Sequence, residues 1–195
     1  KFVFSSSAAV YGYVDVKIKE HYQSMPTNPY GLSKSTVESW LRVYSDLYGL
    51  DWVSLRYFNV YGPRQRGGSP YAGVIGNWIH NAYWNKPLTL YGDGTQVRDF
   101  VYVKDIAKAN ILAMKCPPTK SPIYNICTGQ GVNLNKILDL IVAGDDSIEI
   151  IHEASRKGEV PYSVGDPFRA QQILGWSPNW SLSEGITATK FWRGI

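Results

Sequence analysis

The chain has 195 residues, of which 44% are hydrophobic and 18% are charged, so it can bury one good core and a small second unit, and this composition excludes a disordered chain. Its formal net charge of +4 is not gathered into a run of like charges, which argues against a nucleic-acid arm or a membrane anchor and suits an anionic small molecule. The apolar stretches are too short for a bilayer span or a signal sequence, and the two cysteines lack metal-type or redox-type spacing, so we expect a soluble, cytoplasmic protein.

The first half of the chain predicts a strand, a helix and a second strand. A buried strand over residues 2–4 runs directly into the small polar residues Ser5 to Ser7, with no cap or leading helix before it. A long helical pattern follows over 30–48, and a second buried strand over 52–58. This order implies parallel pairing through a crossover. The expected fold class is therefore α/β, and the chain is expected to begin in the middle of a fold.

The second half alternates between helical and strand patterns after a loop rich in glycine, serine and proline at 67–70. Helices are expected at 74–84, 103–114, 134–142, 166–174 and 182–191, and strands near 89–91, 98–101, 121–127 and 148–152.

The strongest chemical signal is a tyrosine and a lysine at the start of the predicted helix, Tyr30 and Lys34. Residues four apart share one helical face, so the phenol and the ammonium can point into one pocket. A tyrosine is ordinarily protonated at neutral pH, but a neighbouring ammonium favours the phenolate by charge attraction, and a general base becomes available. On spacing alone, an amphipathic helix with a surface lysine is the commoner explanation.

A serine-rich segment upstream changes that balance. The strand over 2–4 ends in Ser5, Ser6 and Ser7, and the ends of strands in parallel sheets are where sites form. A hydroxyl there can hydrogen-bond a substrate alkoxide or carbonyl beside the tyrosine. If the segment stood alone, a polar turn between strand and loop would be the plainer explanation.

Four motifs in order complete the pattern: Ser5-Ser6-Ser7-Ala8-Ala9-Val10-Tyr11-Gly12, Pro29-Tyr30-Gly31-Leu32-Ser33-Lys34, Arg56-Tyr57-Phe58-Asn59-Val60-Tyr61-Gly62-Pro63-Arg64 and Gly92-Asp93-Gly94-Thr95-Gln96-Val97-Arg98-Asp99-Phe100-Val101. Together they resemble the extended short-chain dehydrogenase/reductase family, whose members include NAD-dependent nucleotide-sugar epimerases and dehydratases. The similarity is greatest to its UDP-hexose 4-epimerases, and it extends over essentially the whole chain.

The resemblance implies an active site and a cofactor, NAD. Tyr30 would be the catalytic base, Lys34 would favour its phenolate and hold the nicotinamide ribose, and Ser7 would contact the reacting sugar oxygen. The cofactor-binding residues implied in this way are Ser5, Ser6, Tyr30, Lys34, Tyr57 and Phe58.

A nucleotide-sugar substrate is implied by the same comparison. Ser7 would bind the sugar, and Asn59 would hold its diphosphate. Arg98 would bind phosphate, a role that suits a guanidinium fork, although without the resemblance a surface salt bridge would be the better explanation. Arg156 would meet phosphate and Glu159 the nucleoside ribose, with Glu in place of the family's Asp; a solvated charged turn is the alternative.

Substrate size is predicted from one further position. Ser163 stands where family members carry either a bulky tyrosine or a small residue. A small side chain leaves room for a 2-acetamido group, so we expect N-acetylhexosamine as well as hexose nucleotides to be accepted. UDP is the nucleotide that the resemblance favours, and the synthesis of surface-polysaccharide precursors is the setting it suggests.

The residues after Ser7 favour epimerisation over dehydration. In the family, dehydratases and decarboxylases carry further acid and base groups directly after the catalytic hydroxyl residue, and this chain has Ala8 and Ala9 there. Alanine cannot transfer a proton, so elimination of water lacks its acid and base at the usual positions. A 4-epimerase only has to let a 4-keto sugar rotate and take hydride on its other face.

The family's glycine-rich dinucleotide turn after a leading strand is not found in this sequence. We therefore expect a C-terminal fragment, inactive by itself, with an incomplete NAD site. Its fold would be the C-terminal part of a Rossmann-like parallel sheet plus a small α+β substrate-binding domain. Residues 1–65 would be the C-terminal half of the NAD-binding domain, with helix 103–115 and strand 121–128 returning to it, and 66–102 and 129–195 would be the substrate-binding domain.

Other functions stay open at this point. A 4,6-dehydratase or a 4-keto reductase of the same family would differ in its product. A non-catalytic dinucleotide-sensing scaffold would be expected to lose the catalytic tyrosine or lysine, and this chain has both. Nucleic-acid binding would need a basic stripe, which the sequence does not show. The resemblance also implies a homodimer in which the helix that bears Tyr30 takes part.

Overall fold

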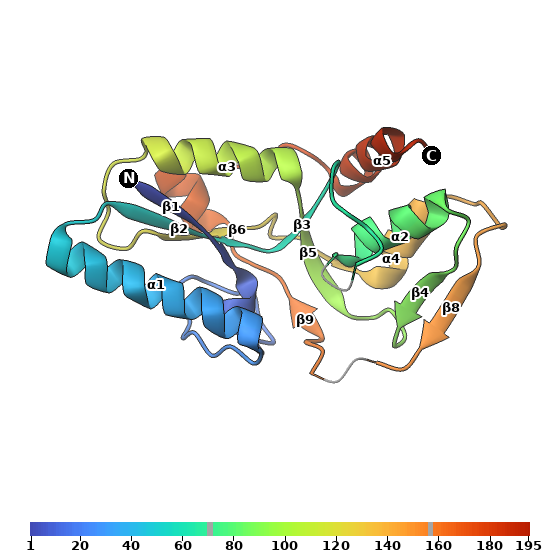
Figure 1. Cartoon of the computed structure of the whole chain (residues 1–195), viewed down its shortest axis with the longest axis horizontal. Helices are drawn as coiled ribbons and strands as arrows, with labels where there is room; N and C mark the ends of the chain where they lie inside the picture. Colours follow the sequence, from blue (N-terminus) through green and yellow to red (C-terminus); the bar gives the residue numbers. More distant parts are fainter. Residues whose placement is uncertain (70–71, 156–157) are drawn as a thin grey trace.

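The computed structural model describes residues 1–69, 72–155 and 158–195. The molecule has two lobes (Figure 1). One lobe is built on a three-stranded parallel sheet in the order β1 (Phe2–Ser7), β2 (Trp52–Tyr57) and β6 (Ile123–Ile126). Figure 1 shows α1 (Pro29–Tyr48) along one face of this sheet and α3 (Val103–Lys115) along the other. The predicted α/β class with a parallel sheet is confirmed.

Local signals at its two ends explain why α1 forms. The side chain of Asn28 accepts a hydrogen bond from the backbone N–H of Gly31 at 2.8 Å, which caps the helix start. Pro29 follows at the first helical position, where its missing N–H costs nothing. Gly49 ends the helix in the left-handed conformation, with φ of 69°. The helix predicted over 30–48 is therefore confirmed.

Three short strands that pair with β5 (Val97–Tyr102) were not expected from the sequence, although β5 itself was expected near 98–101. β5 pairs in parallel with β3 (Asn59–Tyr61) and β9 (Tyr162–Ser163), and antiparallel with β7 (Gly131–Asn133). With two or three residues each, β3, β7 and β9 are too short to show a period-two pattern. They matter because the register sets Ser163 beside Arg98.

The second lobe packs helices around a core of its own. It contains the helices α2 (Val74–Tyr83), α4 (Leu134–Val142) and α5 (Leu182–Arg193), and the parallel pair β4 (Leu88–Tyr91) and β8 (Ile150–Glu153). Where a helix was expected over 166–174, the structure has a π-helix, η2 (Ala170–Leu174). A 3₁₀ turn, η1 (Ala8–Val10), directly follows β1.

Buried hydrophobic residues form two clusters, one in each lobe. The first surrounds Leu55 of β2 and Ala109 of α3, and the second surrounds Trp78 of α2 and Ile137 of α4. Of the helices that the structure describes, none has both the length and the apolar composition of a membrane span.

Candidate active site

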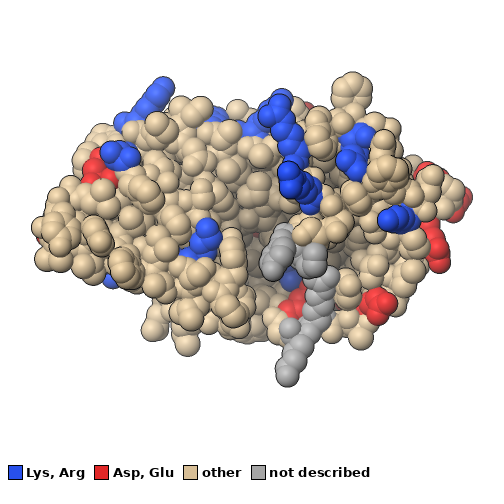
Figure 2. All heavy atoms as spheres, viewed as in Figure 1, with Lys and Arg blue, Asp and Glu red and all other residues tan. Residues whose placement is uncertain are grey.

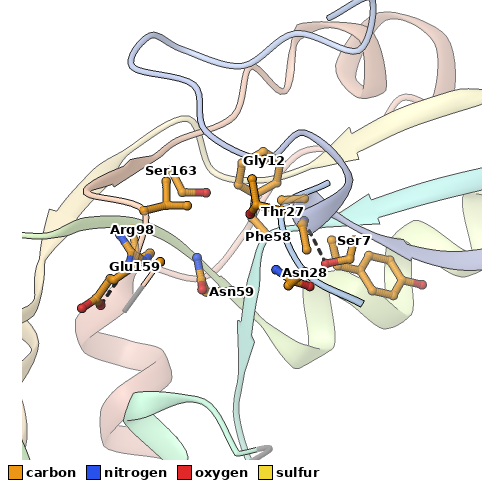
Figure 3. A pocket seen from close by; sticks show the side chains of 14 residues that line it. Ser7, Gly12, Thr27, Asn28, Phe58, Asn59, Arg98, Glu159 and Ser163 are labelled. Carbon is orange, nitrogen blue, oxygen red and sulfur yellow. Dashed lines mark hydrogen bonds and ion pairs between the residues drawn. The ribbon is translucent and has the colours of Figure 1, made fainter. Parts of the chain in front are cut away.

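A cavity of about 390 Å³ lies where β1 and β2 end and the chain passes toward the second lobe (Figure 3). The predicted site residues that line it are Ser7, Tyr57, Phe58, Asn59, Arg98, Glu159 and Ser163. In Figure 3, Ser7 and Asn28 lie on one side and Arg98 and Glu159 on the other, with Asn59 between them. We call this space cavity 1. Its position beyond the carboxyl ends of parallel strands is the usual one for sites in α/β folds.

The hydroxyl of Ser7 is oriented by the turn that follows it. Ser7 is the N-cap of η1, and its Oγ accepts a hydrogen bond from the backbone N–H of Ala9 at 3.2 Å. A hydroxyl that accepts in this way still has its own proton to donate. Ser7 can therefore donate a hydrogen bond to a substrate oxygen in cavity 1.

Tyr30 and Lys34 lie on the first two turns of α1, on one face, as the spacing predicts. The ammonium of Lys34 is 5.6 Å from the centre of the Tyr30 ring and 5.1 Å from that of Phe4. It donates a hydrogen bond to the backbone carbonyl of Ser5 at 2.9 Å, which fixes it at the end of β1. The Tyr30 side chain is 57% exposed, and neither residue is among those that line cavity 1. Tyr30 and Lys34 thus stand outside the walls of cavity 1.

The three serines of β1 do not share one environment. Ser5 Oγ is 3.1 Å from the phenol oxygen of Tyr57, which donates to Oδ1 of Asn110 at 3.0 Å, so Ser5 is the donor to Tyr57. Ser6 points to the opposite face of the sheet, is 2% exposed, and its hydroxyl lies close enough to the buried carboxylate of Glu38 to help lower the pKa of that group. Phe58 is buried beneath cavity 1, against Gly165.

Arg98 and Glu159 form an ion pair at the far side of cavity 1. Their Nη2 and Oε1 atoms are 3.3 Å apart, and the side-chain amide of Gln96 donates to the same oxygen at 3.2 Å. Burial lowers the pKa of Arg98, and the charge of Glu159 opposes this only in part. The sequence predicted separate ligand contacts for the two residues, Arg98 to phosphate and Glu159 to ribose, whereas in the structure their side chains contact each other. Arg156 lies outside the described residues.

Asp99 organises the floor of the site, a role that the sequence analysis missed. Its fully buried carboxylate accepts hydrogen bonds from the backbone N–H and hydroxyl of Thr128 and from the N–H of Gly129, at 2.7–2.9 Å. Burial raises its pKa despite these bonds. Its backbone carbonyl accepts from the side chain of Asn59 at 3.0 Å. The available signal was a lone carboxylate in the otherwise apolar end of β5.

A second cavity, of about 470 Å³, adjoins cavity 1 and shares Glu159 with it. We call it cavity 2. Its walls come from α2 and β4 and include Trp78, Thr89 and Tyr91, with Gln96 at the boundary. Two connected spaces of this size suit an elongated ligand. In the described ranges, no three His, Cys, Asp or Glu side chains gather as a metal site.

Basic side chains are not concentrated around the site. Figure 2 shows lysine and arginine side chains dispersed among uncharged residues, with acidic side chains mainly toward the end of the molecule that carries β8 in Figure 1. Of the described residues that line cavity 1, Arg98 is the only cation. A partly buried guanidinium can hold an anionic group there, although in this structure it is paired with Glu159.

Comparison with known proteins gives a family and a fold. The model of the NAD dependent epimerase/dehydratase family matches residues 1–127. A protein of Methanocaldococcus jannaschii named "Putative UDP-glucose 4-epimerase" is 40% identical over 196 residues, which cover 98% of this chain and 62% of that protein.

Two solved structures are similar throughout the chain. The UDP-N-acetylglucosamine 4-epimerase of Methanobrevibacter ruminantium, in complex with UDP-N-acetylmuramic acid, has a TM-score of 0.91 at 36% identity and matches 97% of this chain and 61% of its own. The UDP-glucose 4-epimerase of Thermus thermophilus, in complex with NAD, has a TM-score of 0.89 at 37% identity and matches 99% and 64%. This chain therefore spans less than two thirds of the length of these relatives.

Two expectations from the sequence are wrong. The chain was expected to be a C-terminal fragment, but the family match occupies residues 1–127, the N-terminal part of this chain. The NAD site was expected to be incomplete, but the first strand of the parallel sheet, β1 at Phe2–Ser7, is present and lies inside the matched region. The lack of a glycine-rich turn after a leading strand therefore did not show that the NAD-binding region is missing.

Proposed function

Because the chain belongs to the NAD dependent epimerase/dehydratase family, we propose that its protein is an NAD-dependent 4-epimerase of UDP-linked hexoses and N-acetylhexosamines. The observation that carries the proposal is the placement of α1 beside the end of β1. There the hydroxyl of Ser7 lines cavity 1, and the Tyr30–Lys34 pair is tied to the same strand end by the hydrogen bond of Lys34 to the carbonyl of Ser5. In this arrangement Tyr30 takes the proton from the C4 hydroxyl of the sugar, and Ser7 donates a hydrogen bond to the same oxygen.

The residues at the end of β1 fit NAD. An ammonium group has three N–H donors, and in the described part of the chain Lys34 uses one of them on the carbonyl of Ser5. The other two can reach the hydroxyls of a ribose. Ser5, Tyr57 and Phe58 complete the proposed cofactor site, with Ser5 and Tyr57 held in place by their hydrogen bond, whereas the buried side chain of Ser6 faces away from it. When bound, NAD supplies the acceptance and return of hydride at C4 of the sugar.

The walls of cavity 1 support epimerisation rather than dehydration. Ala8 and Ala9 line the cavity directly after Ser7, and neither can move a proton. Of the described lining residues, Glu159 is the only carboxylate, and it is paired with Arg98. Among the described residues that line cavity 1, no second acid or base free of an ion pair is available to eliminate water, whereas epimerisation needs only Ser7, Tyr30 and Lys34.

An elongated nucleotide sugar would fit the two cavities with its sugar in cavity 1 and its nucleoside in cavity 2. With the sugar beside Ser7, the diphosphate would lie near Asn59 and Arg98, and the nucleoside would enter cavity 2, which Trp78 and Tyr91 help to line. Arg156 and Glu159 remain proposed contacts to phosphate and ribose. The small side chain of Ser163 leaves cavity 1 wide enough for a 2-acetamido group.

The two buried clusters support a division of labour between the lobes, although Ala170, Leu174 and Trp176 pack in the first cluster and Tyr61 packs in the second. Residues 1–65, together with 103–115 and 121–128, would belong to the NAD-binding domain. Residues 66–102 and 129–195 would form the substrate-binding domain, and the reaction would take place where the two meet.

Mass spectrometry of the product tests this proposal. The protein that carries this chain, incubated with NAD and either UDP-glucose or UDP-N-acetylglucosamine, should give a product of unchanged mass that separates from its substrate by chromatography. Loss of one water would instead identify a 4,6-dehydratase, and oxidation of added NADH together with reduction of an added 4-keto sugar would identify a reductase. Binding of NAD without turnover of any nucleotide sugar would support the non-catalytic scaffold.

Replacing Arg98 with alanine should weaken substrate binding more than it slows chemistry. Hydrogen bonds to a charged phosphate contribute about 1.5–3 kcal/mol each, so we expect the KM for a UDP-sugar to rise by about 10–100-fold, with a smaller change in kcat. Steady-state kinetics measure both constants. Arg42→Ala removes an exposed arginine of α1 outside cavity 1 and is the matched control. Equal KM values for Arg98→Ala and the wild type would remove Arg98 from the phosphate site.

A homodimer through α1 is the assembly we propose. Large side chains along this helix are exposed, and three aromatic rings lie in a row: Trp40 stacks on Tyr44 with ring centres 6.2 Å apart, and Tyr44 packs on Tyr48 in a tilted arrangement at 5.4 Å. A contiguous apolar surface of this kind is typical of an interface. Analytical ultracentrifugation should show a dimer that Trp40→Glu dissociates. A wild-type monomer at micromolar concentration would contradict the proposal.

A further inference from the structure

The first turn of α1 lies unusually close to the turn that follows Ser7. Gly31 is buried in this contact, and a Cβ atom added to it would stand 2.4 Å from the carbonyl oxygen of Ala9 and 3.0 Å from its carbonyl carbon. Both are backbone atoms of η1, so no side-chain rotation could make room. Gly31 is one residue after Tyr30, and Ala9 is two residues after Ser7. The lack of a side chain at Gly31 therefore brings the two proposed catalytic segments together.

The turn on the other side of this contact cannot easily retreat. The backbone carbonyl of Val10 accepts hydrogen bonds from the N–H of Met25 at 3.0 Å and from the hydroxyl of Ser24 at 2.9 Å. Gly12 has φ of 69°, and a Cβ atom there would come within 2.0 Å of the carbonyl oxygen of Met25. These contacts fix the segment that follows Ser7, so a Cβ atom added at Gly31 can be accommodated only by a shift of α1.

We propose that Gly31 is a positioning residue that sets the separation between the hydroxyl of Ser7 and the phenol of Tyr30. The inference rests on the proposed function, because that separation matters only if both groups contact one substrate oxygen. Displacing a reacting group by about 1 Å can lower a rate by about 100-fold, and a Cβ atom at this contact would force a shift of that order. Lys34 would move with Tyr30, since both lie on α1.

Kinetics of Gly31→Ala test this role. We expect kcat to fall by about 10–100-fold, with KM within about threefold of the wild type and with the midpoint of the kcat–pH profile unchanged, because Tyr30 and Lys34 move as one unit. Gly49→Ala is the matched control at the other end of α1. Gly49 has φ of 69° and no neighbour within 4 Å of an added Cβ, so this variant strains the same helix but leaves the site intact. A loss of kcat in Gly49→Ala equal to that in Gly31→Ala would overturn the proposal.

A second variant separates geometry from general destabilisation. In Gly31→Ala with Ala9→Gly, the glycine lets the peptide carbonyl at position 9 turn away, so kcat should recover in part even though a flexible residue has been added. If both variants fold, a kcat of the double variant no higher than that of Gly31→Ala overturns the proposal. If Gly31→Ala alone does not fold, the double variant carries the kinetic test, and a kcat below about 1% of the wild type overturns the proposal.

Crystal structures of the wild type and Gly31→Ala give a readout that does not depend on turnover. The first turn of α1 should lie farther from η1 in the variant, and an unchanged distance between Ser7 Oγ and the Tyr30 phenol oxygen would overturn the proposal. If the wild type does not turn over any UDP-sugar, the proposed function fails, and this distance still decides whether Gly31 sets the spacing.

Discussion

Replacing Tyr30 with phenylalanine should lower kcat for C4 epimerisation by about 10²–10⁴-fold, the range in which a general acid–base group contributes. The substitution removes one oxygen from a side chain that is 57% exposed, so folding should be nearly unaffected. KM for the UDP-sugar should change little, because the diphosphate and the nucleoside supply most of the binding. Steady-state kinetics, with thermal unfolding of the same samples, measure both effects.

Tyr48→Phe is the matched control for this prediction. Tyr48 lies on the same helix and is 72% exposed, but it is at the opposite end of α1 from the site. Its kcat should stay within about twofold of the wild type. A Tyr30→Phe variant with kcat close to that of Tyr48→Phe would mean that another group is the base.

Replacing Glu38 with alanine should lower the free energy of unfolding by about 3–5 kcal/mol, the cost of leaving a buried charge without its partner. Glu38 of α1 and Arg56 of β2 are 3% and 4% exposed, and Arg56 donates to both carboxylate oxygens, at 2.6 Å and 3.0 Å. The hydroxyl of Ser54 donates to Glu38 at 2.7 Å. Chemical denaturation measures the loss. Asp46→Ala removes an exposed carboxylate from the same helix and should change stability by less than about 0.5 kcal/mol.

The stability of the protein at acid pH should depend on the same ion pair of Glu38 with Arg56. Burial of Glu38 opposes its charge, but the hydrogen bonds and charge of Arg56 outweigh burial and lower the pKa of Glu38 below its ordinary value of 4.5. A carboxyl group with a lowered pKa in the folded state stabilises the protein above that ordinary value and loses its contribution as the pH falls through the folded pKa. The wild type should therefore lose stability below about pH 4.5 more steeply than Glu38→Gln. Parallel curves would show that the pKa of Glu38 does not change on folding.

Sequence patterns predicted the parts of the fold that have strong local signals. The helix that carries Tyr30 has a capping asparagine, a proline at its start and a terminal glycine, and each acts over a few residues. The strands over 2–4 and 52–58 are apolar runs long enough to be recognised, and their parallel pairing follows from the helix between them. The side-by-side placement of Tyr30 and Lys34 required only helical geometry.

Features that depend on distant residues could not be predicted in this way. The ion pair of Arg98 with Glu159 joins residues 61 positions apart, and it forms because β9 pairs with β5. Ser6 is buried whereas Ser5 and Ser7 are not, and this difference depends on which face of β1 meets α1. The close contact of Gly31 with Ala9 is set by the packing of a helix against a turn, and a glycine in a sequence does not say which neighbour it admits.

Proton NMR of UDP-glucose incubated with NAD and the protein that carries this chain tests the central claim most directly. The proposal predicts new anomeric and H4 signals of UDP-galactose at the expense of UDP-glucose, and no such signals with Tyr30→Phe. A 4-keto-6-deoxy product, or unchanged spectra for both UDP-glucose and UDP-N-acetylglucosamine, would contradict it.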